Sequence, residues 1–549
     1  MDGIVAAICA DLEVTPLGTR SRLVQPLDGI PILRRTVDRV LRSKRLGGVA
    51  VLVPKSQYEQ ACELLRGTSV IVRNHEAVPP PWLRLARVAR KWSLNGWRGG
   101  IGGTTSLDEY NHPALVDGLL THLQAEAVMI ISPAAPLIDP TLIDRMIEHH
   151  GKVDDEARMT FTETPPGVAG VIYDASLIKE LAQKNIPPGW ILSYKPDAPR
   201  KDLAFFPCCY HAPAVLTHAS GRLIADTDRA FETVRALLAD YPDPDGETIG
   251  AWLADRDGRH VWDLPHEVEL ELTTDDPFPQ AVLRPRGSRV GVRGPLPVET
   301  VEKIARQMSR FDDSLVVLGG YGDPLRHPHF DAILEALRRH GVYGIAVRTA
   351  AVDLNNDTML SLIKHGVDVV TVLLDGWNTS TYSAMSAPDD PAHASLSDAV
   401  ARIEKLEGMR VEHRSPAPTI VPEMVKARQT NGELAEFFDG WIRKVGAVSV
   451  TGYSHFARQL EDHAVMSMAP PGRFACRRIR SRCLVLADGR VTICDQDFAG
   501  RHTIGRVGEQ SLESIWTGPD MQRIRQAHEA RCFDDAMPLC AKCDEWHRP

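Results

Sequence analysis

Cysteine is the residue type whose placement in this sequence most directly indicates chemistry. Four of the ten cysteines lie in the first half, at Cys9, Cys62, Cys208 and Cys209. The other six crowd into the last 74 residues, at Cys476, Cys483, Cys494, Cys532, Cys540 and Cys543. Thiolates gathered in this way are typical of a metal site when the chain shows no sign of secretion.

The strongest local motif is Cys540-Ala-Lys-Cys543, whose spacing lets two thiolates hold one metal centre from a tight turn. We expect the two remaining ligands to be Cys476 and Cys494. Cys494 follows a predicted hairpin over Leu484–Ile493, in which Asp488-Gly489 favours a two-residue turn that would direct Cys494 toward the pair.

Four thiolates suit either zinc or a [4Fe–4S] cluster, and the alternative is a set of unconnected buried cysteines. Cys483 and Cys532 are left over, and we expect them to be packed or free thiols rather than ligands.

Length and composition restrict the kind of protein that carries this motif. The chain has 549 residues, of which 43% are hydrophobic, and this length is too great for one core. Its net charge of −9 gives no overall attraction to nucleic acid. The most apolar stretch, 127–138, contains two prolines and is too short to span a bilayer. We therefore expect a cytoplasmic protein without nucleic-acid or membrane partners.

Apolar runs alternate with helical patterns through most of the chain, which predicts an α/β fold with mostly parallel sheets. We expect a first domain over 1–264, with 78–105 as an insertion or long loop and a last strand near 260–263. A second domain over 265–470 restarts the alternation and predicts a full or partial β/α barrel. The cysteine-rich third domain covers 471–549. The strands expected in the first two domains are 4–9, 49–53, 69–72, 128–132, 268–273, 314–318, 344–348 and 367–374.

The third segment resembles the SPASM domain of radical-SAM enzymes. The resemblance rests on Cys476, the run Asp488-Gly-Arg-Val-Thr-Ile-Cys494, the run Ser511-Leu-Glu-Ser-Ile-Trp516 and the final Pro538-Leu-Cys-Ala-Lys-Cys543. It implies one [4Fe–4S] cluster on the four cysteines, with zinc as the alternative.

The middle segment resembles a radical-SAM barrel. Gly320-Tyr-Gly-Asp-Pro324 is similar to the segment that meets S-adenosylmethionine, and Asp375 is similar to a later family aspartate. The resemblance therefore implies cofactor contacts from Gly320, Gly322, Asp323, Pro324 and Asp375.

The cysteine triad that holds the catalytic cluster in that family is absent. Asp276, Gln280 and Leu283 stand at its C-x3-C-x2-C spacing, and none is a thiolate. We therefore expect no cluster there, no cleavage of S-adenosylmethionine, and doubtful binding of that cofactor.

The first segment resembles cytidylyltransferases through Ile4–Cys9, Pro26–Leu33 and Ala225-Asp226-Thr227. The loop over 10–22, where the family has several glycines, has one. Ala134-Ala135 stand where the resemblance implies a metal-binding aspartate, so Asp226 is the one metal-binding carboxylate that remains.

The three segments together are similar to spirochaete-type SPASM proteins. The sequence predicts an iron–sulfur protein that binds a substrate or a partner enzyme, with electron transfer as a further role open to its cluster. The substrate classes left open are a small molecule, a sugar nucleotide or a peptide. The alternative is an active enzyme, either a radical enzyme that uses the remaining cluster or a nucleotidyltransferase.

Overall fold

The computed structural model describes residues 3–153, 157–257, 260–388 and 394–548. The chain divides into two compact units, Met1–Asp257 and Gly258–Pro549. The predicted third domain belongs to the same compact unit as the second, and the predicted boundary between them stays a prediction. Each unit is described below by itself.

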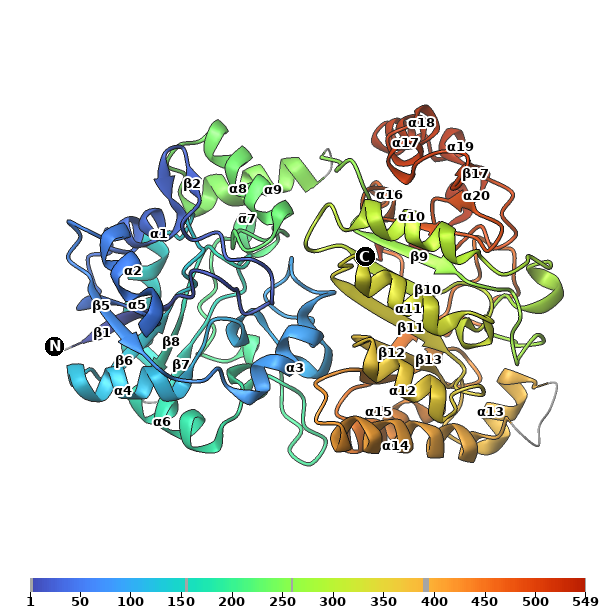
Figure 1. The fold of residues 1–549 in the computed structure, drawn as a ribbon, viewed down its shortest axis with the longest axis horizontal. Coiled ribbons are helices and arrows are strands. Elements are labelled where there is room, and N and C mark those ends of the chain that lie inside the picture. The colour runs from blue at the N-terminus through green and yellow to red at the C-terminus, as the bar shows by residue number, and fades with distance from the viewer. Residues whose placement is uncertain (1–2, 154–156, 258–259, 389–393, 549) are drawn as a thin grey trace. The chain divides into compact units, whose positions relative to one another are not determined.

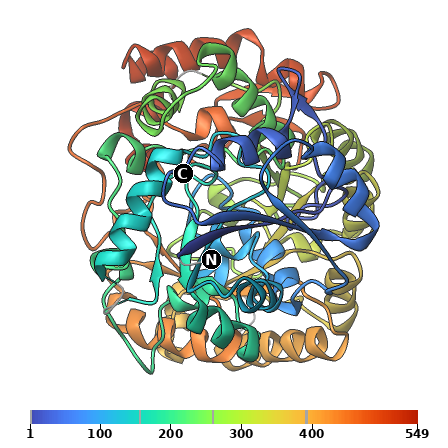
Figure 2. The same ribbon diagram turned by 90° about the vertical axis from the view of Figure 1, so that its left-hand side faces the viewer.

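The first unit is built on a six-stranded sheet in the order β5-β4-β1-β6-β8-β7. The first four strands in this order run parallel, and β8 and β7 continue the sheet by antiparallel pairing. Figure 2 shows β1 and β4 side by side in blue. The strands are β1 (Ile4–Cys9), β4 (Gly48–Pro54), β5 (Ile71–His75), β6 (Ala127–Ile130), β7 (Met159–Thr160) and β8 (Val171–Asp174), and a separate hairpin pairs β2 (Pro26–Leu27) with β3 (Ile30–Pro31).

Helices cover both faces of this sheet because its strands are apolar on both sides. In β1, Ala6 and Ile8 pack on one face, whereas Val5 and Ala7 pack on the other. The first face is covered by α1 (Ile32–Val40), α2 (Tyr58–Leu64), α5 (Pro140–Val153), α7 (Ala214–Thr217), α8 (Asp228–Asp240) and α9 (Gly246–Asp257), and the second by α4 (Pro113–Leu123) and α6 (Ala175–Lys184).

The predicted loop over 78–105 contains a helix, α3 (Pro81–Arg90), so that prediction was wrong in part. Pro81 occupies the first helical turn, where its missing N–H costs nothing. Trp82, Ala86 and Ala89 recur at spacings of four and three and are buried along one side of the helix. The density of Pro, Gly and Arg around this helix concealed its periodicity.

The second unit is built on a nine-stranded sheet in the order β14-β13-β12-β11-β10-β9-β15-β16-β17. Strands β9 to β14 are parallel and follow one another in chain order, as in an open part of a β/α barrel. They are β9 (Glu267–Glu271), β10 (Leu315–Gly319), β11 (Gly344–Thr349), β12 (Val369–Leu373), β13 (Thr419–Lys426) and β14 (Ser449–Gly452). The predicted α/β class with parallel sheets is confirmed for both units.

Helices cover one face of the parallel strands, as Figure 1 shows. Val268, Leu270 and Leu272 point into this helical layer, while Glu267, Glu269 and Glu271 alternate with them. The helices are α10 (Val298–Met308), α11 (Phe330–Arg339), α12 (Asn356–Lys364), α13 (Thr379–Ser386), α14 (Leu396–Glu412) and α15 (Leu434–Val445).

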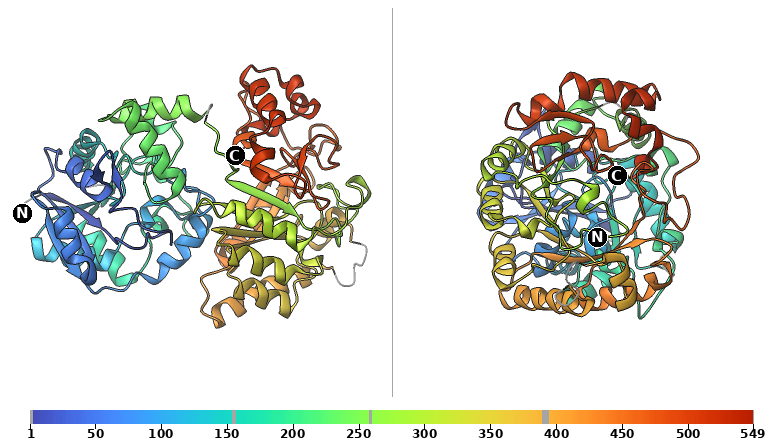
Figure 3. Two further views of the ribbon diagram at one scale, coloured as in Figure 1. Left: turned by 45° about the horizontal axis from the view of Figure 1, so that its top comes forward. Right: turned by 90° about the vertical axis from the view of Figure 1, so that its right-hand side faces the viewer.

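The cysteine-rich segment extends the same sheet. Strand β15 (Arg482–Val485) pairs parallel to β9, and β16 (Arg490–Thr492) and β17 (Thr503–Arg506) follow in antiparallel order. Figure 3 shows this segment in red beside β9. Its short helices are α16 (Arg478–Ser481), α17 (Leu512–Trp516), α18 (Pro519–Glu529), α19 (Phe533–Ala536) and α20 (Pro538–Lys542).

Two local predictions differ from the structure. The hairpin loop has three residues, 487–489, because Leu486 and Arg490 still share a strand hydrogen bond and Gly489 takes φ +83. Residues 260–263 form no strand. The carbonyl of Trp262 accepts a hydrogen bond from the Trp516 indole at 3.0 Å, so this segment docks α17 instead.

Among the described residues, the structure has no helix whose length and apolar character would let it cross a bilayer.

Candidate metal centre

The structure brings the four predicted ligand cysteines to one cavity in the second unit. Cys476 precedes α16, Cys494 follows β16 by two residues, Cys540 lies within α20, and Cys543 ends that helix. All four are free thiols. Three separate stretches of chain therefore have to fold before the donor set is complete.

The surroundings of these thiols suit a soft, buried metal centre. The cavity wall is otherwise mostly apolar, with Ile479, Ile493, Met537, Leu539 and Trp546. The backbone N–H of Glu545 donates to the Cys543 sulfur at 3.3 Å. Backbone donors of this kind stabilise negative charge on thiolate sulfur.

The thiols resist ionisation in the absence of a metal. Burial raises the pKa of Cys540 and of Cys543 to about 12, and neighbouring cysteines of the set add to the effect. Burial, followed by Asp495 and the other thiols, raises the pKa of Cys494 well above its usual value. A bound cation would reverse this balance, because metal binding replaces the thiol protons. The residues present therefore fit a four-thiolate metal group.

The two leftover cysteines lie apart from this set. Cys483 is buried in β15 within the core, and burial raises its pKa to about 12. Cys532 is exposed at the start of α19.

A larger cavity, about 400 Å³, lies beside the cysteines, and we call it the central cavity. Cys494 lines both cavities. The walls of the central cavity come from β9 to β14 and from the cysteine-rich segment. Its charged lining residues are Arg284, Arg286, Arg348, Arg478, Arg482, Arg548, Glu269, Glu423, Asp495 and Glu545.

A buried ion network fills one side of the central cavity. The Arg284 guanidinium donates to both Asp375 oxygens, at 3.0 and 3.1 Å, and to Glu423 at 3.2 Å. Arg348 donates to the same Glu423 oxygen at 3.2 Å. Burial alone would raise the pKa of Glu423, but the two guanidinium groups outweigh it and hold that pKa below its usual range. The Glu423 carboxylate is therefore ionised at neutral pH.

The predicted glycines serve chain packing. A Cβ on Gly320, which has φ +79, would lie 2.6 Å from the Glu271 Cβ, and one on Gly322 would lie 2.3 Å from the Thr273 carbonyl oxygen. The loop after β10 therefore crosses the end of β9 at a distance that only glycine permits. The Gly320 N–H donates to Glu269 at 2.8 Å.

The other predicted cofactor residues have structural partners. Asp323 is buried and accepts hydrogen bonds from the Thr349 hydroxyl and the Ala350 N–H. Pro324 opens a short 3-10 turn, and Asp375 belongs to the ion network. Of the five residues, Gly320 lines the central cavity, and the other four lie outside its wall in the part of the chain that the structure describes.

Three residues stand at the C-x3-C-x2-C spacing noted in the sequence, and none of them is a thiolate. Asp276 forms an ion pair with Arg286 at 3.0 Å. Leu283 is buried against Met385 and Val425. Gln280 is exposed.

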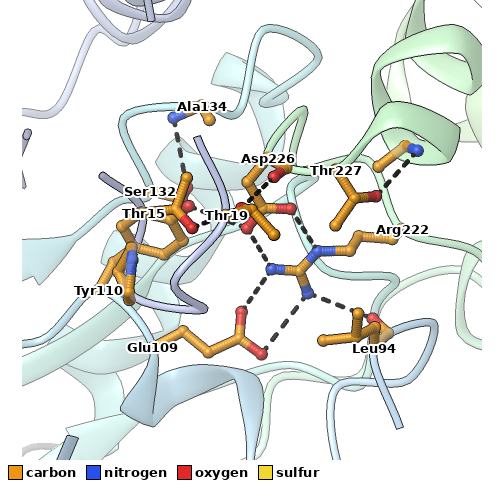
Figure 4. Close-up of polar contacts among 12 residues, drawn as sticks. Thr15, Thr19, Leu94, Glu109, Tyr110, Ser132, Ala134, Arg222, Asp226 and Thr227 are labelled. Carbon is orange, nitrogen blue, oxygen red and sulfur yellow. Dashed lines mark hydrogen bonds and ion pairs between the residues drawn. The ribbon is translucent and has the colours of Figure 1, made fainter. Parts of the chain in front are cut away.

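In the first unit, Asp226 lies at the wall of a cavity of about 170 Å³ together with Ala134. Figure 4 shows its carboxylate held by Arg222 and Tyr110. Arg222 donates to one oxygen at 2.7 Å and to the other at 2.5 Å, and the Tyr110 hydroxyl donates at 2.9 Å. The Asp226 side chain is fully buried, so its lone pairs already serve protein donors.

Sequence reasoning missed Arg284, Arg348 and Glu423, which define the charge of the central cavity. The available signal was the presence of Arg348 and Glu423 inside otherwise apolar strands, where a charge must find a partner.

Comparison with known families identifies the cysteine-rich segment. Residues 476–544 match the family model of SPASM, described as an iron–sulfur cluster-binding domain. The predicted C-terminal SPASM domain is thereby confirmed, and the segment carries the domain type that binds iron–sulfur clusters.

The wider likenesses are more distant. An uncharacterized protein of Treponema pallidum (strain Nichols) is 26% identical over 294 residues, which are 52% of this chain and 79% of that protein. The crystal structure of BtrN in complex with AdoMet and 2-DOIA is similar with TM-score 0.34 and 15% identity, over 51% of this chain and 93% of that one. The structure of a cytidylyltransferase from Leptospira borgpetersenii serovar Hardjo-bovis (strain JB197) is similar with TM-score 0.31 and 15% identity, over 46% of this chain and 93% of that one.

Proposed function

We propose that this protein holds one [4Fe–4S] cluster on Cys476, Cys494, Cys540 and Cys543 and binds a charged ligand in the central cavity, without cleaving S-adenosylmethionine. The observation that carries the proposal is the meeting of the four thiols in one cavity that shares Cys494 with the central cavity. When bound, such a cluster supplies one-electron transfer.

The spacing of the thiols supports a cluster over a single zinc ion. Tetrahedral zinc, with Zn–S bonds of about 2.3 Å, requires sulfur atoms about 3.8 Å apart. Within the described residues, no three of these four sulfur atoms lie within 4.8 Å of one another. A donor set this wide suits a group larger than one ion.

The loss of radical initiation is supported by the residues at the triad spacing. Asp276 is engaged by Arg286, and Leu283 is an apolar core residue. A cluster at this place would need three thiolates and room for iron, whereas the chain offers an ion-paired carboxylate, an amide and a buried leucine.

The chemistry of the central cavity indicates the class of ligand. Six arginines and four carboxylates line it, and the ion network fixes several of them. Such a wall pairs best with a ligand that carries both acceptors for guanidinium and donors for carboxylate, such as an amino-acid unit of a peptide. Arg478, which donates to Asp495 at 2.6 Å beside Cys494, would place such a ligand next to the cluster.

The test is anaerobic incubation of the full chain with S-adenosylmethionine and a strong reductant, followed by measurement of 5′-deoxyadenosine. We expect none above the level of a Cys540→Ser control. Steady production that the control lacks would refute the proposal and make the remaining cluster catalytic.

A second candidate function is nucleotidyl transfer, favoured by the first-unit cavity at the ends of the parallel strands. Mg²⁺ requires free carboxylate oxygens, and the Asp226 carboxylate is committed to Arg222 and Tyr110. We therefore expect no pyrophosphate release with any nucleoside triphosphate and Mg²⁺. Release that Asp226→Ala abolishes would establish the transferase instead.

A further inference from the structure

A second cluster of metal-binding side chains lies in the first unit, remote in sequence from the SPASM cysteines. Glu163, Cys209 and His211 each offer a ligand atom, and these three atoms all lie within 4.8 Å of one another. The Cys209 Sγ lies 4.0 Å from the His211 Nδ1, which in turn lies 3.9 Å from a Glu163 carboxylate oxygen.

The backbone explains why these side chains meet. Phe161 and Cys209 form a parallel bridge, in which the Phe161 N–H donates to the Cys208 carbonyl and the Tyr210 N–H donates to the Phe161 carbonyl, at 3.0 and 2.8 Å. Side chains two residues apart on an extended chain share a face. Glu163 and His211 each lie two residues beyond a bridge partner, so both come to the face on which Cys209 lies.

We propose that Glu163, Cys209 and His211 form a zinc site, with water or another exogenous ligand in the fourth position. Thiolate, imidazole and carboxylate are the three donor types that zinc takes in proteins. At Zn–ligand lengths of about 2.0–2.3 Å, tetrahedral donors lie about 3.3–3.6 Å apart. Two of the three separations, at 4.0 and 3.9 Å, are therefore about half an ångström wider than in the bound form, and the third is at most 4.8 Å. Side-chain rotation can close these differences.

The surroundings favour binding at this place. Cys209 is buried and His211 is exposed, so the site has one anchored ligand and one that can close over an ion arriving from solvent. The Glu163 carboxylate has its other oxygen 3.9 Å from Arg98, whose guanidinium also pairs with Asp202 at 2.5 Å. A thiolate and a carboxylate together neutralise the charge of Zn²⁺.

Such a site would link the segment around Cys209 and His211 to the residues that follow β7, which include Glu163. The three ligands lie together only in the folded unit, so Zn²⁺ would bind the folded state more tightly than the unfolded chain. Added zinc should therefore raise the thermal stability of the first unit. This proposal is independent of the cluster on the SPASM cysteines.

The test is titration of the full-length protein, purified with its cluster, with Co²⁺ as a spectroscopic substitute for Zn²⁺. Absorption from thiolate-to-cobalt charge transfer reports coordination by Cys209. Four variants are compared with the wild type: Cys209→Ser, His211→Ala, and the matched controls Cys208→Ser and His122→Ala. Cys208 is the buried neighbour of Cys209, and His122 is an exposed histidine of α4.

We expect the wild type and both controls to bind one equivalent of Co²⁺, displaceable by Zn²⁺, that Cys209→Ser and His211→Ala lack. Cobalt held by the SPASM cysteines would appear equally in all five proteins and cancel in the comparison. If Cys209→Ser fails to fold, the test rests on cobalt binding by His211→Ala, because removal of an exposed histidine disturbs packing little. Equal cobalt binding by wild type and His211→Ala would overturn the proposal.

Discussion

Single residues in the second unit show how buried charges depend on one another. Asp276 stands at the first position of the missing cysteine triad and pairs with Arg286. Arg284 follows directly after the last position and joins Asp375 to Glu423. A buried guanidinium between two carboxylates leaves uncompensated charge when it is removed, so these side chains depend on one another.

At this scale, Arg284→Met should destabilise the second unit by about 3–5 kcal/mol, because Asp375 and Glu423 would lose their shared partner while staying buried. The matched control is Lys444→Met, which removes an exposed ion pair with Glu404 and should cost about 0–1 kcal/mol. Thermal melts of the two variants measure the difference. Equal shifts for both variants would show that the network adds nothing to stability.

The cysteines give a second residue-scale prediction. Cys540→Ser or Cys543→Ser should remove most of the bound iron and loosen the C-terminal segment, because metal binding and folding are coupled. Cys532→Ser should keep the iron, since Cys532 is exposed and lies outside the cysteine cavity. Iron analysis of the three variants measures this, and full iron content in both Cys540→Ser and Cys543→Ser would mean that the ligand set is wrong.

The helices and strands that show a regular spacing of apolar residues could be predicted from the sequence. Local structures that depend on contacts with distant parts of the chain could not. Strand β1 matches its predicted bounds, and β9 to β12 lie within a few residues of theirs. Each is a short run between turn residues, apolar in most cases and alternating between apolar residues and glutamate in β9. The periodicity of helix α3 was concealed by the Pro, Gly and Arg residues around it. The docking of residues 260–263 on Trp516 is a contact made only after folding.

The candidate site divides in the same way. The convergence of the four cysteines followed from their crowding and their motif. The packing role of Gly320 and Gly322 could not be predicted, because the sequence cannot show that their loop crosses β9. Asp226 lies at the wall of the first-unit cavity, but the Tyr110 hydroxyl that donates to it comes from more than 100 positions away and left no local signal. Arg222 lies only four positions before Asp226 and was not recognised as its partner from the sequence.

One loop contact of the first unit should depend on pH. Burial raises the pKa of Asp108 to about 6, although its carboxylate accepts hydrogen bonds from the Gly189 and Thr105 N–H groups. A carboxyl whose pKa is raised on folding stabilises the fold fully below its unfolded pKa near 4, and this contribution is lost as the pH rises through about 6.

Wild type should therefore lose stability relative to Asp108→Asn as the pH rises from about 4 to about 6, by an amount on the order of 2–3 kcal/mol, and the difference should be constant above that window. Paired thermal melts across the window measure it. A difference that is flat with pH, or that grows in the wild type's favour, would contradict the burial argument.

At the scale of the whole molecule, the second unit combines an open parallel barrel with a SPASM domain that extends the same sheet through the pairing of β15 with β9. This continuity brings the cysteine cavity next to the central cavity, so that Cys494 belongs to both. A ligand in the central cavity and a cluster on the cysteines would then lie side by side, which is the arrangement that the proposed function requires.

The measurement that tests this account most directly is the iron and acid-labile sulfide content of the full chain purified anaerobically. One [4Fe–4S] cluster predicts about four iron and four sulfide per chain. About eight of each would contradict the account by showing a second cluster in the barrel, and zinc with negligible iron would contradict it by showing that the four cysteines hold a single ion.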